Sequence, residues 1–232
     1  MDRETYMRSL KLGSSLLISA LPVLLAIIYF AYPSFYAIVI DRFITHSTEA
    51  QLRKVDVSSY APINRSRQGI PVLVYHQISE RPGEYCVTKR QFLEHLKLLK
   101  HLGYTTVSID ELDRYLNHGG RLPKNPILIT FDDGERNAYI GADEALRLLG
   151  MKATMFVITS LPKQESSRSL NWRELRQMRR SGRWDIQSHT YDGHSLNDAK
   201  VERMYLKRLL IHDSTSVKDL YNNLKSSYGS LN

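Results

Sequence analysis

From Pro71 onward, the chain alternates between short apolar runs and amphipathic segments. The runs have the length and the β-branched and aromatic content of buried strands, and they lie at 72–75, 104–109, 126–131, 152–159 and 184–188. Helical spacing of apolar residues fills the intervals, at 88–102, 110–117, 136–149, 171–180, roughly 197–211 and 217–226. Strands that alternate with helices predict an α/β fold with a parallel sheet, either open or closed into a barrel.

The third predicted strand ends in two adjacent carboxylates, Asp132 and Asp133, followed by Gly134. Neighbouring carboxylates repel each other, and a divalent cation is the simplest way to keep them ionised. The fifth predicted strand ends next to His189, and His194 follows five residues later. Both clusters lie at carboxyl ends of strands, where folds of this kind place their chemistry. Two imidazoles and one carboxylate leave coordination positions open for water and substrate.

Two motifs resemble those of the polysaccharide deacetylase family. The run Thr130–Gly134 matches the first motif residue for residue, and His189-Thr190 followed by His194 is similar to the second. The spacing of five between the histidines resembles the branch that acts on poly-β-1,6-N-acetylglucosamine. The opening Pro71–His76 resembles the start of that branch's domain. The resemblance covers residues 70 to about 230 and implies a distorted (β/α) barrel.

The resemblance also implies an activity, the metal-dependent hydrolysis of N-acetyl groups from an N-acetylglucosamine polymer, either an exopolysaccharide or a cell-wall glycan. Residue by residue, it implies that Asp133, His189 and His194 bind a divalent metal, commonly zinc. It implies that Asp132 is the general base, a role that typically contributes ~10²–10⁴-fold to the rate.

The family's later motifs have no counterpart in this sequence. The third, which leads to Pro-Tyr/Phe-Gly, is missing, and so is the one that supplies a general-acid histidine. We therefore expect a domain incomplete at its C-terminus, with an exposed sheet edge and weakened or lost activity. The alternative is a membrane-anchored remnant that retains glycan or metal binding without catalysis. A non-haem iron oxygenase could use the same ligand types, but strand–helix alternation argues against it.

The N-terminal segment predicts a membrane anchor, because residues 12–40 carry no charged side chain and are long enough to span a bilayer. A cleaved signal peptide is disfavoured, since the apolar run exceeds the usual h-region. The expected organisation is a cytoplasmic tail at 1–12, a transmembrane anchor at 13–40, a linker at 41–69 and the partial domain at 70–232. Basic residues flank both ends of the apolar run, so the extracytoplasmic location of the domain at the cell membrane is implied by the substrate alone.

The remaining features are less specific. A net charge of +8 from scattered basic residues fits anionic surfaces, and no nucleic-acid motif or obligate protein partner emerges. The single cysteine, Cys86, is expected to be a buried thiol. His76 follows a strand, and its side chain either faces the site or packs against other side chains of the fold. Solvent exposure is expected for His95, His101, His118 and His212. Both tryptophans, Trp172 and Trp184, are expected to fill core or rim rather than stack on sugars.

Overall fold

The computed structural model describes residues 33–63, 69–80, 83–163, 166–192 and 208–228, together with Pro22, Ala26 and Tyr29. It divides into two compact units, residues 1–47 and 48–232. Most of the predicted anchor at 13–40 lies outside the described residues. Among the residues that are described, no helix is both long and apolar enough to cross a membrane.

Helix α2 (Pro33–Lys54) forms the first part of the predicted linker at 41–69. It begins at a proline, which suits the first helical position because that residue needs no amide donor. Its C-terminal end is stabilised by a side chain from far along the chain. The Lys97 ammonium donates to the Leu52 carbonyl at 2.7 Å and also to the Val55 carbonyl. This tertiary capping has no counterpart in the local sequence.

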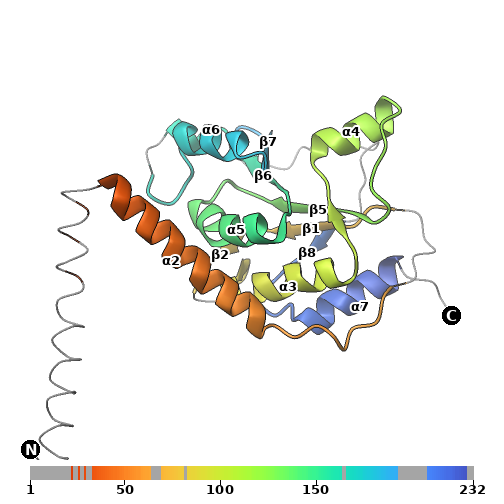
Figure 1. Ribbon diagram of the computed structural model, residues 1–232. Helices are drawn as coiled ribbons and strands as arrows, with labels where there is room; N and C mark the ends of the chain where they lie inside the picture. Colours follow the sequence, from red (N-terminus) through yellow and green to blue (C-terminus); the bar gives the residue numbers. More distant parts are fainter. Residues whose placement is uncertain are drawn as a thin grey trace, which may run out of the picture. The chain divides into compact units, whose positions relative to one another are not determined.

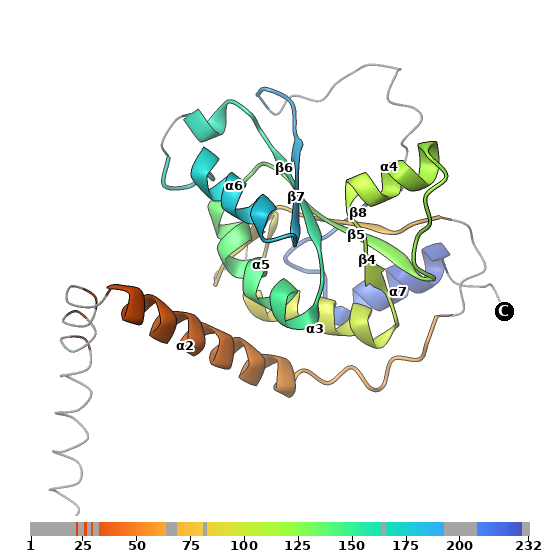
Figure 2. The same ribbon diagram turned by 45° about the horizontal axis from the view of Figure 1, so that its top comes forward.

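Six parallel strands form the main sheet, in the order β7–β6–β5–β1–β8, with β4 paired to the start of β5 (Figures 1 and 2). Their bounds are β1 (Val72–Tyr75), β4 (Thr105–Thr106), β5 (Pro126–Phe131), β6 (Ala153–Val157), β7 (Trp184–Ser188) and β8 (Arg208–Leu210). A separate parallel pair consists of β2 (Gln77–Ile78) and β3 (Cys86–Val87). The predicted parallel sheet is confirmed. Within the described residues, β7 and β8 are its two edge strands.

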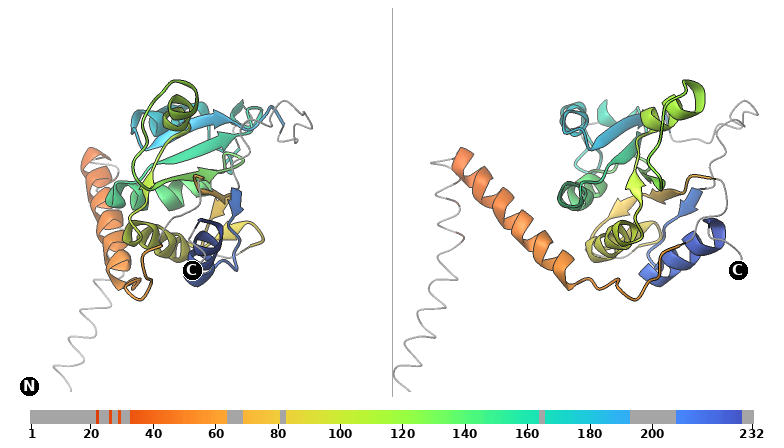
Figure 3. Two further views of the ribbon diagram at one scale, coloured as in Figure 1. Left: turned by 90° about the vertical axis from the view of Figure 1, so that its right-hand side faces the viewer. Right: turned by 45° about the vertical axis from the view of Figure 1, so that its right-hand side comes forward.

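Alternate side chains of the strands enter two separate apolar clusters, one on each face of the sheet. The larger cluster includes Leu73, Ile127 and Ile129 and packs under α3 (Lys89–His101), α5 (Arg136–Leu149) and α7 (Val217–Tyr228). Figure 3 shows these three helices along one side of the sheet. The smaller cluster joins Leu128 to Leu112 of α4 (Ile109–Asn117). Buried strands of this kind are typical of parallel sheets covered on both faces.

The helix boundaries follow local sequence signals. Thr88 and Asn171 form capping boxes at the starts of α3 and α6 (Trp172–Arg180). Gly150 ends α5 in the left-handed conformation, at φ +65°. A short 3₁₀ turn, η1 (Leu161–Lys163), lies between β6 and α6.

Two expectations of the sequence are corrected. The helix expected near 197–211 is wrong at its end, because residues 208–210 form β8 beside β1; residues 197–207 lie outside the described part. A run of leucines fits helix and strand equally, and pairing with a buried strand decides between them. His95 is completely buried rather than solvated. Trp184 is buried in the core and Trp172 is 44% exposed, and both positions fit the expected placement in core or rim. Cys86 is buried as expected.

Candidate active site

The site begins at the carboxyl end of β5, an interior strand of the sheet. The Asp132 amide donates to the Tyr75 carbonyl of β1 at 2.9 Å, which continues the β1–β5 ladder by one residue. Asp132 is only 5% exposed, whereas the side chain of Asp133 is 36% exposed. The two neighbouring carboxylates therefore meet different surroundings, one inside the fold and the other at its surface.

A tight turn directs the two side chains apart. Asp133 has a φ of +73°, a left-handed conformation that is uncommon for a residue with a side chain. Gly134 follows at φ +79°, and its amide donates back to the Asp132 carbonyl at 3.0 Å. A Cβ at this glycine would lie 3.0 Å from Cγ1 of Val157. Unfavourable backbone conformations cluster at functional sites, which makes this turn a candidate for chemistry.

Arg208 holds the buried carboxylate. Its Nη2 donates to both oxygens of Asp132, at 2.9 and 2.7 Å. A buried carboxylate needs such a partner, because burial without compensation strongly disfavours the charged form. Each carboxylate oxygen retains a further lone pair, so Asp132 can still accept a proton from a bound water molecule. The sequence reasoning missed Arg208, which lay in a segment expected to be helical.

His189 approaches both carboxylates from the end of β7. Its Nε2 lies 3.6 Å from Oδ1 of Asp133 and 4.0 Å from Oδ2 of Asp132. Two ligands of one tetrahedral zinc ion, each ~2.1 Å from it, are about 3.4 Å apart. The Asp133–His189 separation is close to that spacing, and an imidazole with a carboxylate is a donor set that suits zinc.

The third predicted ligand, His194, lies outside the described residues. Among the side chains that are described, no three His, Cys, Asp or Glu residues gather closely enough to hold an ion. The structure does place the His189 imidazole within 4.0 Å of a carboxylate oxygen of Asp132 and of Asp133. The full ligand set of Asp133, His189 and His194 stays a prediction.

A second imidazole, that of His76, follows the carboxyl end of β1, next to the carboxyl end of β5. Tyr75 pairs with Phe131 in the β1–β5 register, so the next residues, His76 and Asp132, leave neighbouring strands side by side. The Nδ1 atom of His76 is buried and has no hydrogen-bond partner among the described residues. The ring lies 5.2 Å, centroid to centroid, from that of Tyr85. Of the two interpretations left open by the sequence, the register supports the one in which His76 lies beside the site.

Comparisons with known proteins point to one family. The sequence profile of the polysaccharide deacetylase family matches residues 119–210, which include Asp132, Asp133 and His189. YxkH of Bacillus subtilis, named as a candidate polysaccharide deacetylase, is 31% identical over 65% of this chain and 52% of its own length. The poly-β-1,6-N-acetyl-D-glucosamine N-deacetylase of Staphylococcus aureus is 27% identical over 64% of this chain and 50% of its own.

Among solved structures, the Streptococcus pyogenes deacetylase PplD, in complex with acetate, aligns with a TM-score of 0.51. It is 28% identical, and the alignment covers 61% of this chain and 66% of that one. The chain spans about half the length of the curated relatives it matches.

Proposed function

The chain belongs to the polysaccharide deacetylase family, and from this premise we propose that it hydrolyses N-acetyl groups from an N-acetylglucosamine polymer. The observation that carries the proposal is the convergence of a buried, arginine-held carboxylate with a second carboxylate and an imidazole. A relative named for its action on poly-β-1,6-N-acetyl-D-glucosamine supports the substrate class. A solved relative that binds acetate, the acid released by such a hydrolysis, supports the reaction type.

In this proposal Asp132 is the general base. It accepts a proton from water as the water oxygen attacks the acetamide carbonyl carbon. Arg208 holds the carboxylate in a fixed orientation through hydrogen bonds to both of its oxygens, so that it is placed to accept that proton. Burial of Asp132 limits competition from bulk water for the same oxygens.

Asp133 and His189, with His194 from outside the described residues, would hold a divalent metal such as zinc. When bound, such an ion polarises the carbonyl and lowers the pKa of water. The 3.6 Å separation of the Asp133 and His189 donor atoms supports this assignment.

His76 is the residue that we assign to the departing amine. Breaking the amide bond requires a proton on the leaving nitrogen, and a histidine beside the base is suited to supply it. His76 leaves the strand next to that of Asp132, and its Nδ1 has no partner in the described part of the protein. There the His76 ring would deliver a proton to the leaving nitrogen, and the proton that Asp132 takes from water would replace it.

Acetate release from N-acetylglucosamine oligomers tests the function. The Asp132→Asn variant keeps the shape of the site but removes the base, so we expect the rate to fall by ~10²–10⁴-fold. Asp113→Asn is the matched control, because Asp113 lies on the exposed side of α4 with its side chain 49% accessible. A chelator should stop release by the wild-type protein. Equal rates for the wild type and the Asp132→Asn variant would contradict the assignment.

A second candidate is a glycan- or metal-binding protein without turnover. It is favoured by the sheet, in which β7 and β8 each pair on one side only among the described residues. Unpaired edges leave the site less enclosed, which disfavours turnover more than binding. Glycan binding without any acetate release would support this second candidate.

We also propose that residues 13–40 anchor the domain at the outer side of the cell membrane. A tag added at the C-terminus should then be accessible to protease on intact cells.

A further inference from the structure

We propose that a hollow beside Trp172 binds a further sugar unit of the same acetylated glycan, away from the unit that loses its acetyl group. The hollow has a volume of about 510 Å³ and is lined by Trp172, Arg136, Asn171, Arg173, Pro162 and Ser167, among others. Pockets of ~300–1,000 Å³ are typical of small-molecule sites. The inference rests on the proposed function, since it takes its ligand from the same polymer.

The exposed indole is the feature that selects a sugar. Trp172 is 44% exposed, whereas the other tryptophan, Trp184, is 3% exposed. Trp172 lines the hollow together with polar side chains, and an indole combines a large apolar face with a polar N–H. Its flat apolar face suits the C–H face of a pyranose ring. The guanidinium and amide groups around it supply donors for hydroxyl and acetamide oxygens.

The hollow is tied to the catalytic turn through a continuous set of hydrogen bonds. The Leu170 amide donates to the Gly134 carbonyl at 3.0 Å, and the Arg136 amide donates to the Arg168 carbonyl at 2.8 Å. Glu135 accepts from Nε of Arg168 at 2.8 Å. The segment that leads to Trp172 is therefore fixed against the residues that follow Asp132 and Asp133.

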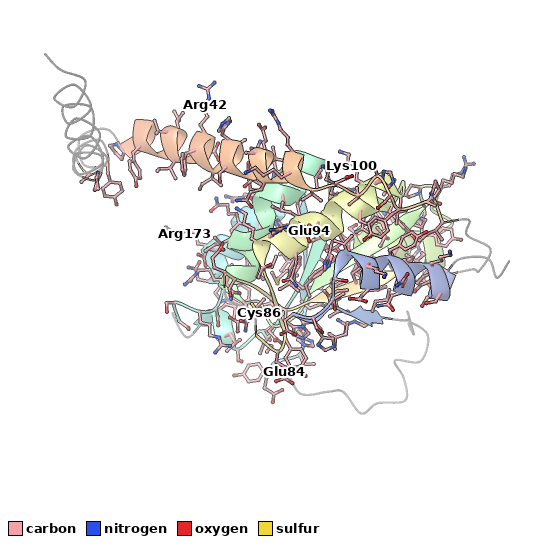
Figure 4. All side chains as sticks on the ribbon, turned by 90° about the horizontal axis from the view of Figure 1, so that it is seen from below. Arg42, Glu84, Cys86, Glu94, Lys100 and Arg173 are labelled. Atoms are coloured by element: carbon pink, nitrogen blue, oxygen red, sulfur yellow. The ribbon has the colours of Figure 1, made fainter. Side chains whose placement is uncertain are left out.

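Arg136 joins the two sides of the hollow. Its guanidinium pairs with Glu174 of α6, with Nε 2.9 Å from Oε1 and Nη2 3.1 Å from Oε2, and Nη1 donates to the Ser167 carbonyl. This pairing leaves the floor of the hollow close to neutral, which suits an uncharged, acetylated sugar. Arg173 points outward at the edge of the molecule (Figure 4). It adds a positive charge that disfavours a deacetylated, cationic unit.

Chain-length dependence of acetate release tests the site. The substrates are the dimer and the hexamer of β-1,6-linked N-acetylglucosamine, with the full-length protein in each case. Trp172→Ala should raise KM for the hexamer about tenfold while leaving kcat and all constants for the dimer unchanged. Trp172→Phe keeps an aromatic face and should stay within about twofold of the wild type. Tyr115→Ala is the matched control, because Tyr115 is an equally exposed aromatic on α4.

Calorimetric titration separates this inference from the proposed function. The hexamer is titrated into the Asp132→Asn protein and into the Asp132→Asn, Trp172→Ala protein, and we expect the second Kd to be about tenfold weaker. If the wild type releases no acetate but this difference is present, the proposed function fails and the sugar site stands. Equal hexamer affinities of the two proteins, or equal effects of Trp172→Ala on dimer and hexamer, would overturn the sugar site.

Discussion

Replacing His95 should change how the stability of the protein depends on pH. His95 is completely buried beneath α3 and makes two hydrogen bonds. Its Nε2 lies 3.0 Å from the carbonyl of Thr215, which can only accept, so Nε2 carries the proton. The Tyr75 hydroxyl, whose pKa is raised by burial, donates to Nδ1 at 3.1 Å. The neutral ring thus links β1 and α3 to the segment that precedes α7.

Burial lowers the pKa of His95 from 6.5 to about 4, although the Thr215 carbonyl opposes the change by favouring the charged ring. Because the folded pKa is the lower one, the unfolded chain binds the proton first as the pH falls. The stability contributed by His95 is complete above pH 6.5 and is lost between pH 6.5 and 4. At ~1.36 kcal/mol for each pH unit, the loss between pH 7.5 and 4.5 is ~2.5 kcal/mol.

The assay is urea unfolding of the wild type and of His95→Phe at pH values across that range, followed by far-UV circular dichroism. Phenylalanine leaves the Tyr75 hydroxyl and the Thr215 carbonyl unpaired, so we expect it to be less stable by ~2–4 kcal/mol at pH 7.5. The difference in unfolding free energy between wild type and variant should shrink by ~2.5 kcal/mol at pH 4.5, because the variant has no imidazole to protonate. His118→Gln is the control, since the side chain of His118 is 66% exposed. A wild-type-to-variant difference that is independent of pH would refute this reasoning.

Three further substitutions follow from the geometry. Gly134→Ala should lower the unfolding free energy by ~1–3 kcal/mol, because φ is +79° and Val157 lies 3.0 Å from the added methyl; denaturant titration measures it. Gly141→Ala should lower the unfolding free energy by ~1–3 kcal/mol, since its Cβ would lie 2.5 Å from Cγ2 of Ile78. In a double-mutant cycle, adding Ile78→Ala should recover part of that loss. Arg208→Gln should lower kcat ~10–100-fold with a smaller change in KM, and Arg208→Lys should restore part of it; unchanged kcat would remove Arg208 from the site.

Local signals were sufficient for much of the fold. The buried strands correspond to short apolar runs of the sequence. Thr88 and Asn171 begin α3 and α6, and Gly150 ends α5, at the boundaries that the sequence predicts for these helices. These features depend on side chains within a few residues of each other, so a single sequence contains the information. The same holds for Asp132 and Asp133, since a strand that ends in two carboxylates and a glycine specifies its own turn.

Features that depend on distant contacts could not be predicted in this way. Lys97, far along the chain, caps the C-terminal end of α2. His95 is buried because Tyr75 and a carbonyl from the segment before α7 satisfy both of its nitrogens. In each case the free energy of a polar group depends on whether a partner from elsewhere reaches it, and no local pattern records that.

The sequence by itself determined the alternation of strands and helices, the carboxylate pair at the end of β5 and the histidine at the end of β7. Only the tertiary structure decided that β8 lies beside β1, which carries Arg208 to Asp132. The register between β1 and β5, which places His76 beside Asp132, is likewise a tertiary feature. The physical reason is that a leucine-rich segment gains similar burial as helix or strand, so the choice follows from which partner offers hydrogen bonds and apolar surface at the sheet edge.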